Sequence, residues 1–110
     1  MAIMAGVVVL GPFIEEATYR GALQGAFRAA GFSPWTSIVM STAAFVLMHI
    51  PAIPREGMAG ALAGLTALAL VLGLLRERSR SIVPSVIAHA AFNVANLAIA
   101  GAFGGLFGGS

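Results

Sequence analysis

Two histidines and a pair of adjacent glutamates lie within sequence that is otherwise almost entirely apolar. Glu15 and Glu16 end an uncharged run and are followed by Arg20, while His49 and His89 interrupt two later apolar runs. Ionisable side chains inside long apolar segments cost free energy, so they are usually retained for catalysis, ion binding or proton transfer. The distribution of these residues therefore predicts a buried site that contains carboxylate and imidazole groups.

The two carboxylates are predicted to have different roles because of their spacing. Adjacent residues of a helix differ by about 100° in direction, so Glu15 and Glu16 should not share a face. Glu16 stands four residues before Arg20, in the order that favours a helical ion pair. Glu15 is then free to act as a base or as a metal ligand. The alternative is a purely structural ion-pair cluster at the end of a helix.

Each histidine has a companion at helical spacing. Phe45 precedes His49 by four residues and His89 precedes Asn93 by four, so each pair should share a helix face. A lone histidine in a membrane helix is usually a packing residue that hydrogen-bonds a neighbouring helix. Two histidines that occur together with Glu15 favour a functional cluster instead.

Two arrangements of these groups would hydrolyse an amide bond. Glu15, His49 and His89 can hold a zinc ion with an open position for water. Without a metal, Glu15 and His49 can activate a water molecule directly. In that second arrangement, His89 and Asn93 donate hydrogen bonds to a tetrahedral oxyanion.

Other nucleophiles are not indicated by the sequence. The chain contains no cysteine, and the HExxH motif of soluble zinc proteases is absent. Ser41 and Ser85 lie within apolar stretches, where a serine usually bonds to the backbone of its own helix. Activated water is therefore the nucleophile that we expect.

The elements that must position these groups are long and apolar. Hydrophobic residues make up 59% and charged residues 9% of the 110 residues, and the mean hydropathy is +0.96. Soluble domains carry about 25% charged residues, so a soluble enzyme, a disordered segment and a nucleic-acid-binding protein are disfavoured. We predict an all-α, polytopic transmembrane bundle of about four helices, forming one domain over residues 1–110.

Four apolar stretches are candidates for these helices, and proline, glycine and serine mark their ends. The first stretch, residues 1–14, should continue as a helix to about residue 30, and Ser33 and Pro34 should begin the second. Pro51 and Pro54 should end the second helix, and Pro84 should lie in the first turn of the last. The later stretches span residues 34–53, 57–75 and 81–107. The Gly-rich segment at residues 104–110 is expected to be a flexible tail.

Helix geometry predicts that the four candidate groups share one layer of the membrane. At 1.5 Å per residue, Glu15 and His49 each lie about 23 Å from the turn that joins the first two helices. His89 and Asn93 lie about 14 and 20 Å beyond the turn that precedes the last helix. In a four-span arrangement these two turns are on the same side of the membrane.

The arginines give a provisional orientation. Most of the arginines lie on the side of the membrane that carries the turn between the first two helices and the turn before the last helix. They are Arg20, Arg28, Arg76, Arg78 and Arg80. The opposite turn has only Arg55, beside Glu56. The positive-inside rule places the arginine-rich side in the cytoplasm.

The three polar patterns resemble the motifs EExxxR, FxxxH and HxxxN of the CPBP intramembrane proteases. This family includes the type II CAAX prenyl endopeptidases and the bacteriocin-processing or Abi proteins. The motifs stand here as EEATYR (15–20), FVLMH (45–49) and HAAFN (89–93), in the same order and in separate stretches. The resemblance covers residues 11–98. It departs from the family at Tyr19, where phenylalanine is commoner, and in length, because the helices that flank this core in many members are missing or very short.

The resemblance implies an intramembrane endopeptidase of the metalloprotease type. Glu15 would be the catalytic glutamate, and Glu16 its companion, held by Arg20. The remaining motif residues would activate water, bind a metal or stabilise the oxyanion: His49, His89 and Asn93. The family has been described both as zinc-dependent and as glutamate-dependent without a metal, so the resemblance leaves Zn²⁺ open.

The resemblance also implies partners and a location. We expect a multi-pass protein of a bacterial plasma membrane, with the lipid bilayer and a membrane-anchored peptide or protein as partners and no nucleic acid. The substrate would be a prenylated CAAX-type or a bacteriocin-like peptide, and the oligomeric state is left open. The alternative is a non-proteolytic immunity or scaffold protein of the same family. A proton or ion pathway ranks last, because the third stretch offers essentially no polar groups.

Overall fold

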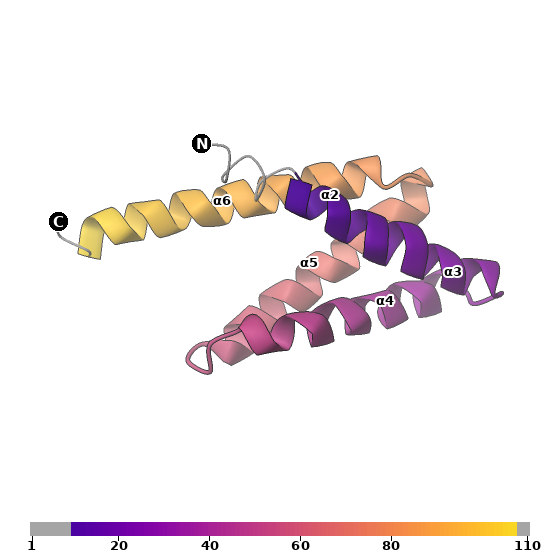
Figure 1. Ribbon diagram of the computed structural model, residues 1–110, viewed down its shortest axis with the longest axis horizontal. Coiled ribbons are helices and arrows are strands. Elements are labelled where there is room, and N and C mark those ends of the chain that lie inside the picture. Colours follow the sequence, from indigo (N-terminus) through magenta and orange to yellow (C-terminus); the bar gives the residue numbers. More distant parts are fainter. Residues whose placement is uncertain (1–9, 108–110) are drawn as a thin grey trace.

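The computed structural model describes residues 10–107, with side chains described as far as residue 101. All regular secondary structure in this range is helical, as predicted (Figure 1). Three of the helices are long and apolar enough to cross a membrane. The polytopic all-α prediction is therefore confirmed for the described residues, and most of the first apolar stretch, residues 1–9, lies outside them.

The first helix is continuous but changes its winding beside the candidate site. It consists of α2 (Gly11–Glu16), the π-helical segment η2 (Ala17–Leu23) and α3 (Gln24–Ala29). The prediction that a helix continues beyond the two glutamates is confirmed. The π-helical segment begins directly after Glu16 and contains Arg20, and such wide turns occur frequently at functional sites. Gly31, at φ +98°, reverses the chain after α3.

The predicted boundaries of the second helix are confirmed. The side chain of Ser33 accepts a hydrogen bond from the backbone N–H of Thr36, so it caps α4 (Pro34–His49). Pro34 occupies the first turn, where the N–H that proline lacks has no partner to lose. A short 3₁₀ turn, η3 (Ile50–Ala52), which contains Pro51, follows α4.

The last two helices differ at their ends from the apolar stretches that predicted them. α5 (Met58–Ser79) includes two of the arginines that follow its apolar run. α6 (Val83–Phe107) begins with Pro84 in its first turn, as predicted, and extends into the glycine-rich segment. Residues 104–107 of the predicted tail are therefore helical, and residues 108–110 lie outside the described range.

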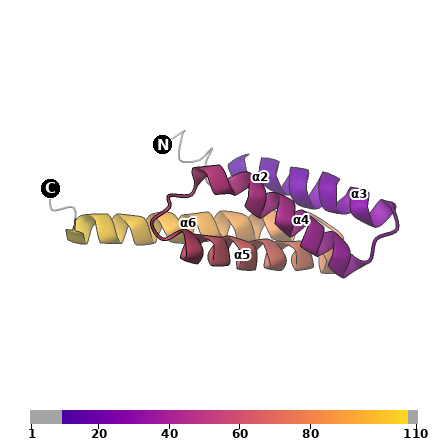
Figure 2. The same cartoon turned by 90° about the horizontal axis from the view of Figure 1, so that it is seen from below.

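The helices pack in a sequence of neighbours (Figures 1 and 2). α4 lies along α5, α5 lies along α6, and the first helix packs on α4 and α6. The C-terminal half of α6 extends beyond the other helices. The turns at 30–33 and 80–82 lie at the same end of the molecule, as predicted from the four-span arrangement.

The interior is unusually polar and the outer surface is apolar. The fully buried polar side chains include Glu16, Arg20, Gln24, Ser37, Ser41 and Ser85. Large apolar side chains point outward along every helix, among them Phe13, Val39, Leu47, Val71 and Ile87. Lipid tails solvate such a surface, whereas water does not. The chain is therefore an integral membrane protein whose polar groups are gathered inside.

Arg20 was counted among the arginines that predict the orientation, and this count is wrong. Its side chain is fully buried and paired with Glu16, so it does not belong to a water-exposed turn. The arginine-rich end keeps four arginines without it: Arg28, Arg76, Arg78 and Arg80.

Candidate active site

Glu15 lies between the two histidines. Its Oε1 is 3.6 Å from Nε2 of His49, on α4, and its Oε2 is 3.4 Å from Nε2 of His89, on α6. The Glu15 side chain is 38% exposed, whereas that of His89 is only 6% exposed. Three separate helices therefore bring one carboxylate and two imidazoles together, as the depth calculation predicts.

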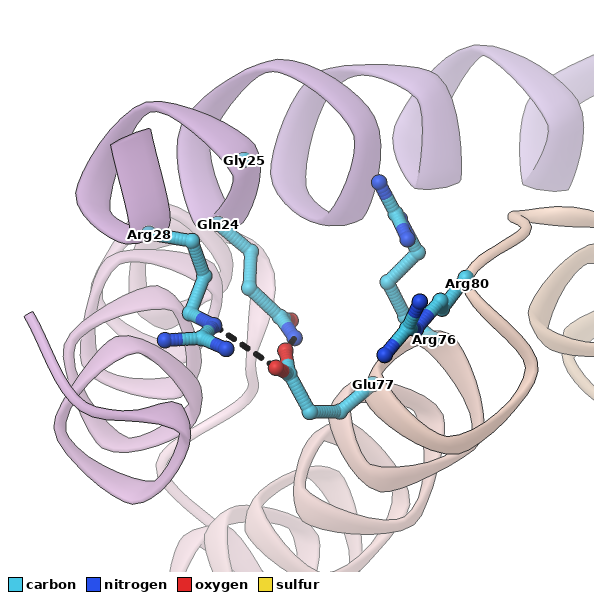
Figure 3. A pocket seen from close by; sticks show the side chains of 6 residues that line it. All are labelled: Gln24, Gly25, Arg28, Arg76, Glu77 and Arg80. Atoms are coloured by element: carbon cyan, nitrogen blue, oxygen red, sulfur yellow. Dashed lines mark hydrogen bonds and ion pairs between the residues drawn. The ribbon is translucent and has the colours of Figure 1, made fainter. Parts of the chain in front are cut away.

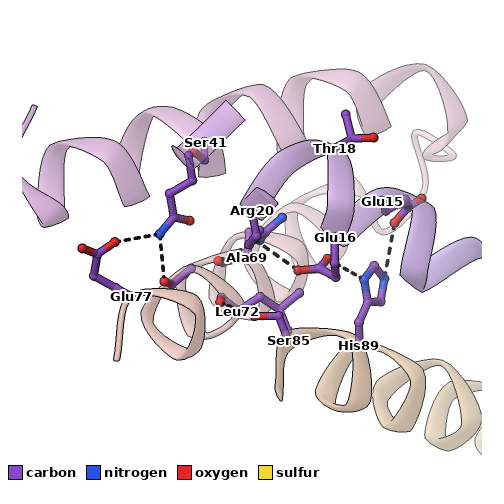
Figure 4. Close-up of polar contacts among 12 residues, drawn as sticks. Glu15, Glu16, Thr18, Arg20, Ser41, Ala69, Leu72, Glu77, Ser85 and His89 are labelled. Carbon is purple, nitrogen blue, oxygen red and sulfur yellow. Dashed lines mark hydrogen bonds and ion pairs between the residues drawn. The ribbon is translucent and has the colours of Figure 1, made fainter. Parts of the chain in front are cut away.

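Both carboxylates reach the same imidazole, which was not expected (Figure 4). Oε2 of Glu16 is 2.8 Å from Nδ1 of His89, while Glu15 approaches Nε2 on the other edge of the ring. The two glutamates do not share a face, since Glu16 is fully buried and Glu15 is 38% exposed, yet they meet at one ring. The imidazole carries a nitrogen on each edge, so it can bridge carboxylates that leave the helix in different directions.

The hydrogen bonds of the histidines orient Nε2 of both rings toward Glu15. Nδ1 of His49 lies 2.6 Å from the backbone carbonyl of Phe45, which can only accept, so this nitrogen carries the proton. Nδ1 of His89 bonds to the carboxylate of Glu16. Such a bond at one ring nitrogen fixes the orientation of the imidazole and leaves the other nitrogen for chemistry.

Arg20 anchors the buried carboxylate. Its Nε is 3.4 Å from Oε1 of Glu16, which confirms the predicted ion pair, and both side chains are fully buried. Nη2 of Arg20 also donates a 2.8 Å hydrogen bond to the backbone carbonyl of Ala69 on α5. The guanidinium lies over the ring of Phe45, 4.9 Å from its centroid. Arg20 thus fixes Glu16 against two neighbouring helices.

Phe45 is the aromatic centre of the site. Its ring centroid is 4.3 Å from that of His49, which confirms that the two residues share a helix face. It makes edge contacts with His89 and with Tyr19, at 6.1 and 5.3 Å between centroids. Tyr19 keeps an aromatic contact at the position where it departs from the family motif.

A cavity of about 420 Å³ opens beside this cluster. Glu15, His49, His89 and Asn93 all line it, so the described side chains place the four predicted groups around one space. The residues that the sequence analysis did not single out are Gly11, Pro12, Leu65, Leu68, Phe92 and Asn96. Asn96 had a detectable signal, since it follows His89 by seven residues on the same face of an apolar helix.

The serines behave differently from each other. The hydroxyl of Ser41 donates to the carbonyl of Ser37 in its own helix, as expected. The hydroxyl of Ser85 instead donates to the carbonyl of Leu72 on α5, at 2.8 Å, so that expectation is wrong. Both hydroxyls are buried and bonded to backbone, and neither lines the cavity.

The predicted zinc ligands lie together without completing a metal-binding group. Within residues 10–101, no set of three His, Cys, Asp or Glu side chains has the arrangement needed to hold a metal ion. Glu15 uses a different oxygen for each of His49 and His89, which separates the two contacts. Zinc at these residues stays a prediction.

Comparison with known proteins gives one match. The sequence model of a family described as type II CAAX prenyl endopeptidase Rce1-like matches residues 1–95. This range contains all three polar motifs. No curated protein and no solved structure matches the chain.

Proposed function

The chain belongs to the Rce1-like family of type II CAAX prenyl endopeptidases, and on this premise we propose that it is an intramembrane endopeptidase in which Glu15 activates water. The observation that supports this most strongly is the position of Glu15. Its carboxylate faces Nε2 of both histidines at the edge of a cavity formed by membrane helices. A carboxylate and two imidazoles inside apolar helices are too costly to serve as ordinary packing groups.

The first step is attack by water. A water molecule on the cavity side of Glu15 and His49 donates one hydrogen bond to each of them. Glu15 takes one proton from this water as the oxygen bonds to the scissile carbonyl carbon. The product of this step is a tetrahedral intermediate with a negatively charged oxygen.

The oxyanion requires hydrogen-bond donors in the cavity. The side chains of Asn93 and His89, which both line the cavity, supply them.

The second step breaks the peptide bond. The intermediate collapses, the carbon–nitrogen bond breaks, and Glu15 returns its proton to the leaving nitrogen. The products are a carboxylic acid, which keeps the second proton of the water until it ionises in solvent, and a new amine, so Glu15 ends the cycle ionised. The other buried groups, Glu16 and Arg20, touch neither water nor substrate and act by holding His89 in place.

The substrate that fits this site is a membrane-anchored peptide. Leu65 and Leu68 form an apolar wall of the cavity, while Asn93 and Asn96 offer amide groups on α6. A peptide in extended conformation presents backbone N–H and C=O groups that such amides can bind. The family's description favours a prenylated CAAX-type C-terminus as the anchor.

Cleavage by the full chain in proteoliposomes tests this function. The substrates are membrane-anchored peptides offered in pairs, with and without a prenyl group on a C-terminal cysteine. We expect the parent chain to cleave the prenylated member and His49→Gln to cleave it about 10²-fold more slowly. His49 is the better position for this test, because among the described residues its side chain hydrogen-bonds only to its own helix. The substitution also leaves the Glu16–Arg20 pair intact.

The outcomes separate the candidate functions. Equal cleavage by the parent and by His49→Gln would contradict the proposed site. Cleavage of both members of each pair would retain the protease and remove the requirement for prenylation. A folded parent chain that binds these peptides without cleaving any of them would favour the immunity or scaffold function.

A further inference from the structure

A second polar cavity, of about 410 Å³, lies at the arginine-rich end of the molecule (Figure 3). It is lined by Gln24, Gly25, Arg28, Arg76, Glu77 and Arg80, from the first helix and from the end of α5. None of these residues lines the cavity beside Glu15. This cavity is a separate site, and three guanidinium groups face it against one carboxylate.

One of the three arginines is already neutralised. Oε1 of Glu77 is 2.7 Å from Nε of Arg28, and Oε2 of Glu77 accepts a 3.2 Å hydrogen bond from Gln24. Arg28 also donates from Nη1 to the carbonyl of Phe32. Both oxygens of the only carboxylate in the cavity therefore have partners.

Arg76 and Arg80 are left without a counter-charge. Among the described residues, no carboxylate lies within ion-pair distance of either guanidinium, and the buried Nε of Arg76 has no hydrogen-bond partner. They are four residues apart at the end of α5, where like charges repel each other. A buried donor without a partner costs free energy, so an anion between these groups would be stabilising.

The backbone at Arg80 is also unusual. Arg80 has φ +57°, the left-handed conformation that glycine usually supplies after a helix. An arginine there is retained at a cost in backbone strain. The helix dipole favours a cation at the end of α5, but Arg78 already supplies an exposed cation in the last turn. The dipole therefore does not require an arginine at position 80.

We propose that this cavity binds the phosphate of an anionic phospholipid headgroup. Guanidinium groups bind phosphate oxygens through paired hydrogen bonds, and Arg76 and Arg80 are the two available donors. The cavity lies where the apolar span of α5 ends, which is the depth of the headgroups. Trp35, at the start of α4 and 64% exposed, lies at the same end, as is typical of aromatic residues at the membrane interface.

Thermal unfolding of the purified full chain in neutral detergent micelles tests this proposal. The probes are dioctanoyl phosphatidylglycerol, dioctanoyl phosphatidylcholine and inorganic phosphate, each added over a range of concentrations. We expect a saturable rise of the unfolding temperature with phosphatidylglycerol alone. Removal of each arginine should weaken this binding about fivefold, and Arg76→Gln with Arg80→Gln together about 25-fold.

Arg78→Gln is the matched control, because it removes the same charge from the same helix end without lining the cavity. It should bind phosphatidylglycerol as the parent does. If the double variant fails to fold, Arg80→Gln alone carries the test, since its side chain is exposed. An equal response to phosphatidylcholine, or equal weakening by Arg78→Gln, would overturn the site. An equal response to inorganic phosphate would overturn the assignment to a lipid.

Discussion

Among single residues, His89 connects the catalytic and supporting halves of the site. Its Nε2 contacts the carboxylate of Glu15 and its Nδ1 contacts the carboxylate of Glu16. Glu16 in turn is paired with Arg20. The two neighbouring glutamates therefore differ in burial: Glu16 is fully buried, and Glu15 faces the cavity. This difference supports the roles proposed for them, positioning for Glu16 and catalysis for Glu15.

Neutralising each glutamate should separate stability from activity. Glu16→Gln leaves the buried Arg20 without its counter-charge, so we expect a loss of about 3–5 kcal/mol in the free energy of unfolding together with loss of cleavage. Glu15→Gln, at the partly exposed position, should change stability by less than about 1 kcal/mol. Denaturant unfolding in detergent micelles measures both variants. Equal stability losses would contradict the different roles assigned to the two residues.

Contacts within one helix were predictable in detail, whereas between helices only the common depth of Glu15, His49 and His89 was predictable. The pairs Glu16–Arg20 and Phe45–His49 follow from a spacing of four residues, which the helix imposes. The bond from Ser85 to Leu72 depends on how α6 lies against α5. No local pattern in the sequence encodes that placement.

At the scale of elements, the first helix and α5 are joined by polar residues at regular intervals. The contacting side chains of the first helix occur every four residues: Arg20, Gln24 and Arg28. They meet groups of α5 that are also four residues apart: Ala69, Gly73 and Glu77. The active-site cavity lies at one end of this series and the arginine-lined cavity lies at the other.

Close approach of the helices depends on Gly73. A Cβ at this position would lie 3.0 Å from Cγ2 of Ile38 and 3.3 Å from Oε1 of Gln24. Gly73→Ala should therefore destabilise the chain by about 1–3 kcal/mol. Gly64→Ala is the matched control on the same helix, because no atom lies within 4 Å of its added Cβ.

The unfolding of these two variants in detergent measures the effect. We expect Gly64→Ala to be neutral or to stabilise by up to about 1 kcal/mol, because alanine is the better helix former. Similar losses in both variants would show that the glycines act through backbone conformation rather than through packing.

Helix ends were more predictable than helix winding. Ser33, Pro34 and Pro84 act locally, and each lies at the start of its helix as predicted. The π-helical segment from Ala17 to Leu23 was not predicted, because no residue type marks such a turn in a sequence. The Gly-rich segment 104–110 was predicted to be a flexible tail, yet α6 continues to Phe107.

For the whole molecule, the distribution of arginines predicts an orientation in the membrane. Four arginines lie at the end with the 30–33 and 80–82 turns, against Arg55 beside Glu56 at the other. The first end should face the cytoplasm. The anionic lipid proposed for the arginine-lined cavity would then belong to the cytoplasmic leaflet.

Labelling of single cysteines tests this orientation without background, because the chain has no cysteine. A membrane-impermeant maleimide applied to intact cells should label Glu56→Cys, and should label Ala30→Cys only after the membrane is opened. Both positions are exposed. The reverse pattern would show that the arginine-rich end faces outward.

The central claim is that Glu15 activates the water that cleaves the substrate. Its most direct test is the single-turnover rate of peptide cleavage by the purified parent chain and by Glu15→Gln, with bound zinc measured in the same samples. Glu56→Gln, an exposed glutamate at the far turn, is the matched control. Zinc that co-purifies in proportion to activity would favour the metal-bound form of the water.

The predicted result is a rate about 10²–10⁴-fold lower for Glu15→Gln, with Glu56→Gln equal to the parent. Removal of a general base alone accounts for a loss of this size. Cleavage by Glu15→Gln at the rate of the parent would contradict the claim, because the remaining groups of the cavity would then suffice for hydrolysis.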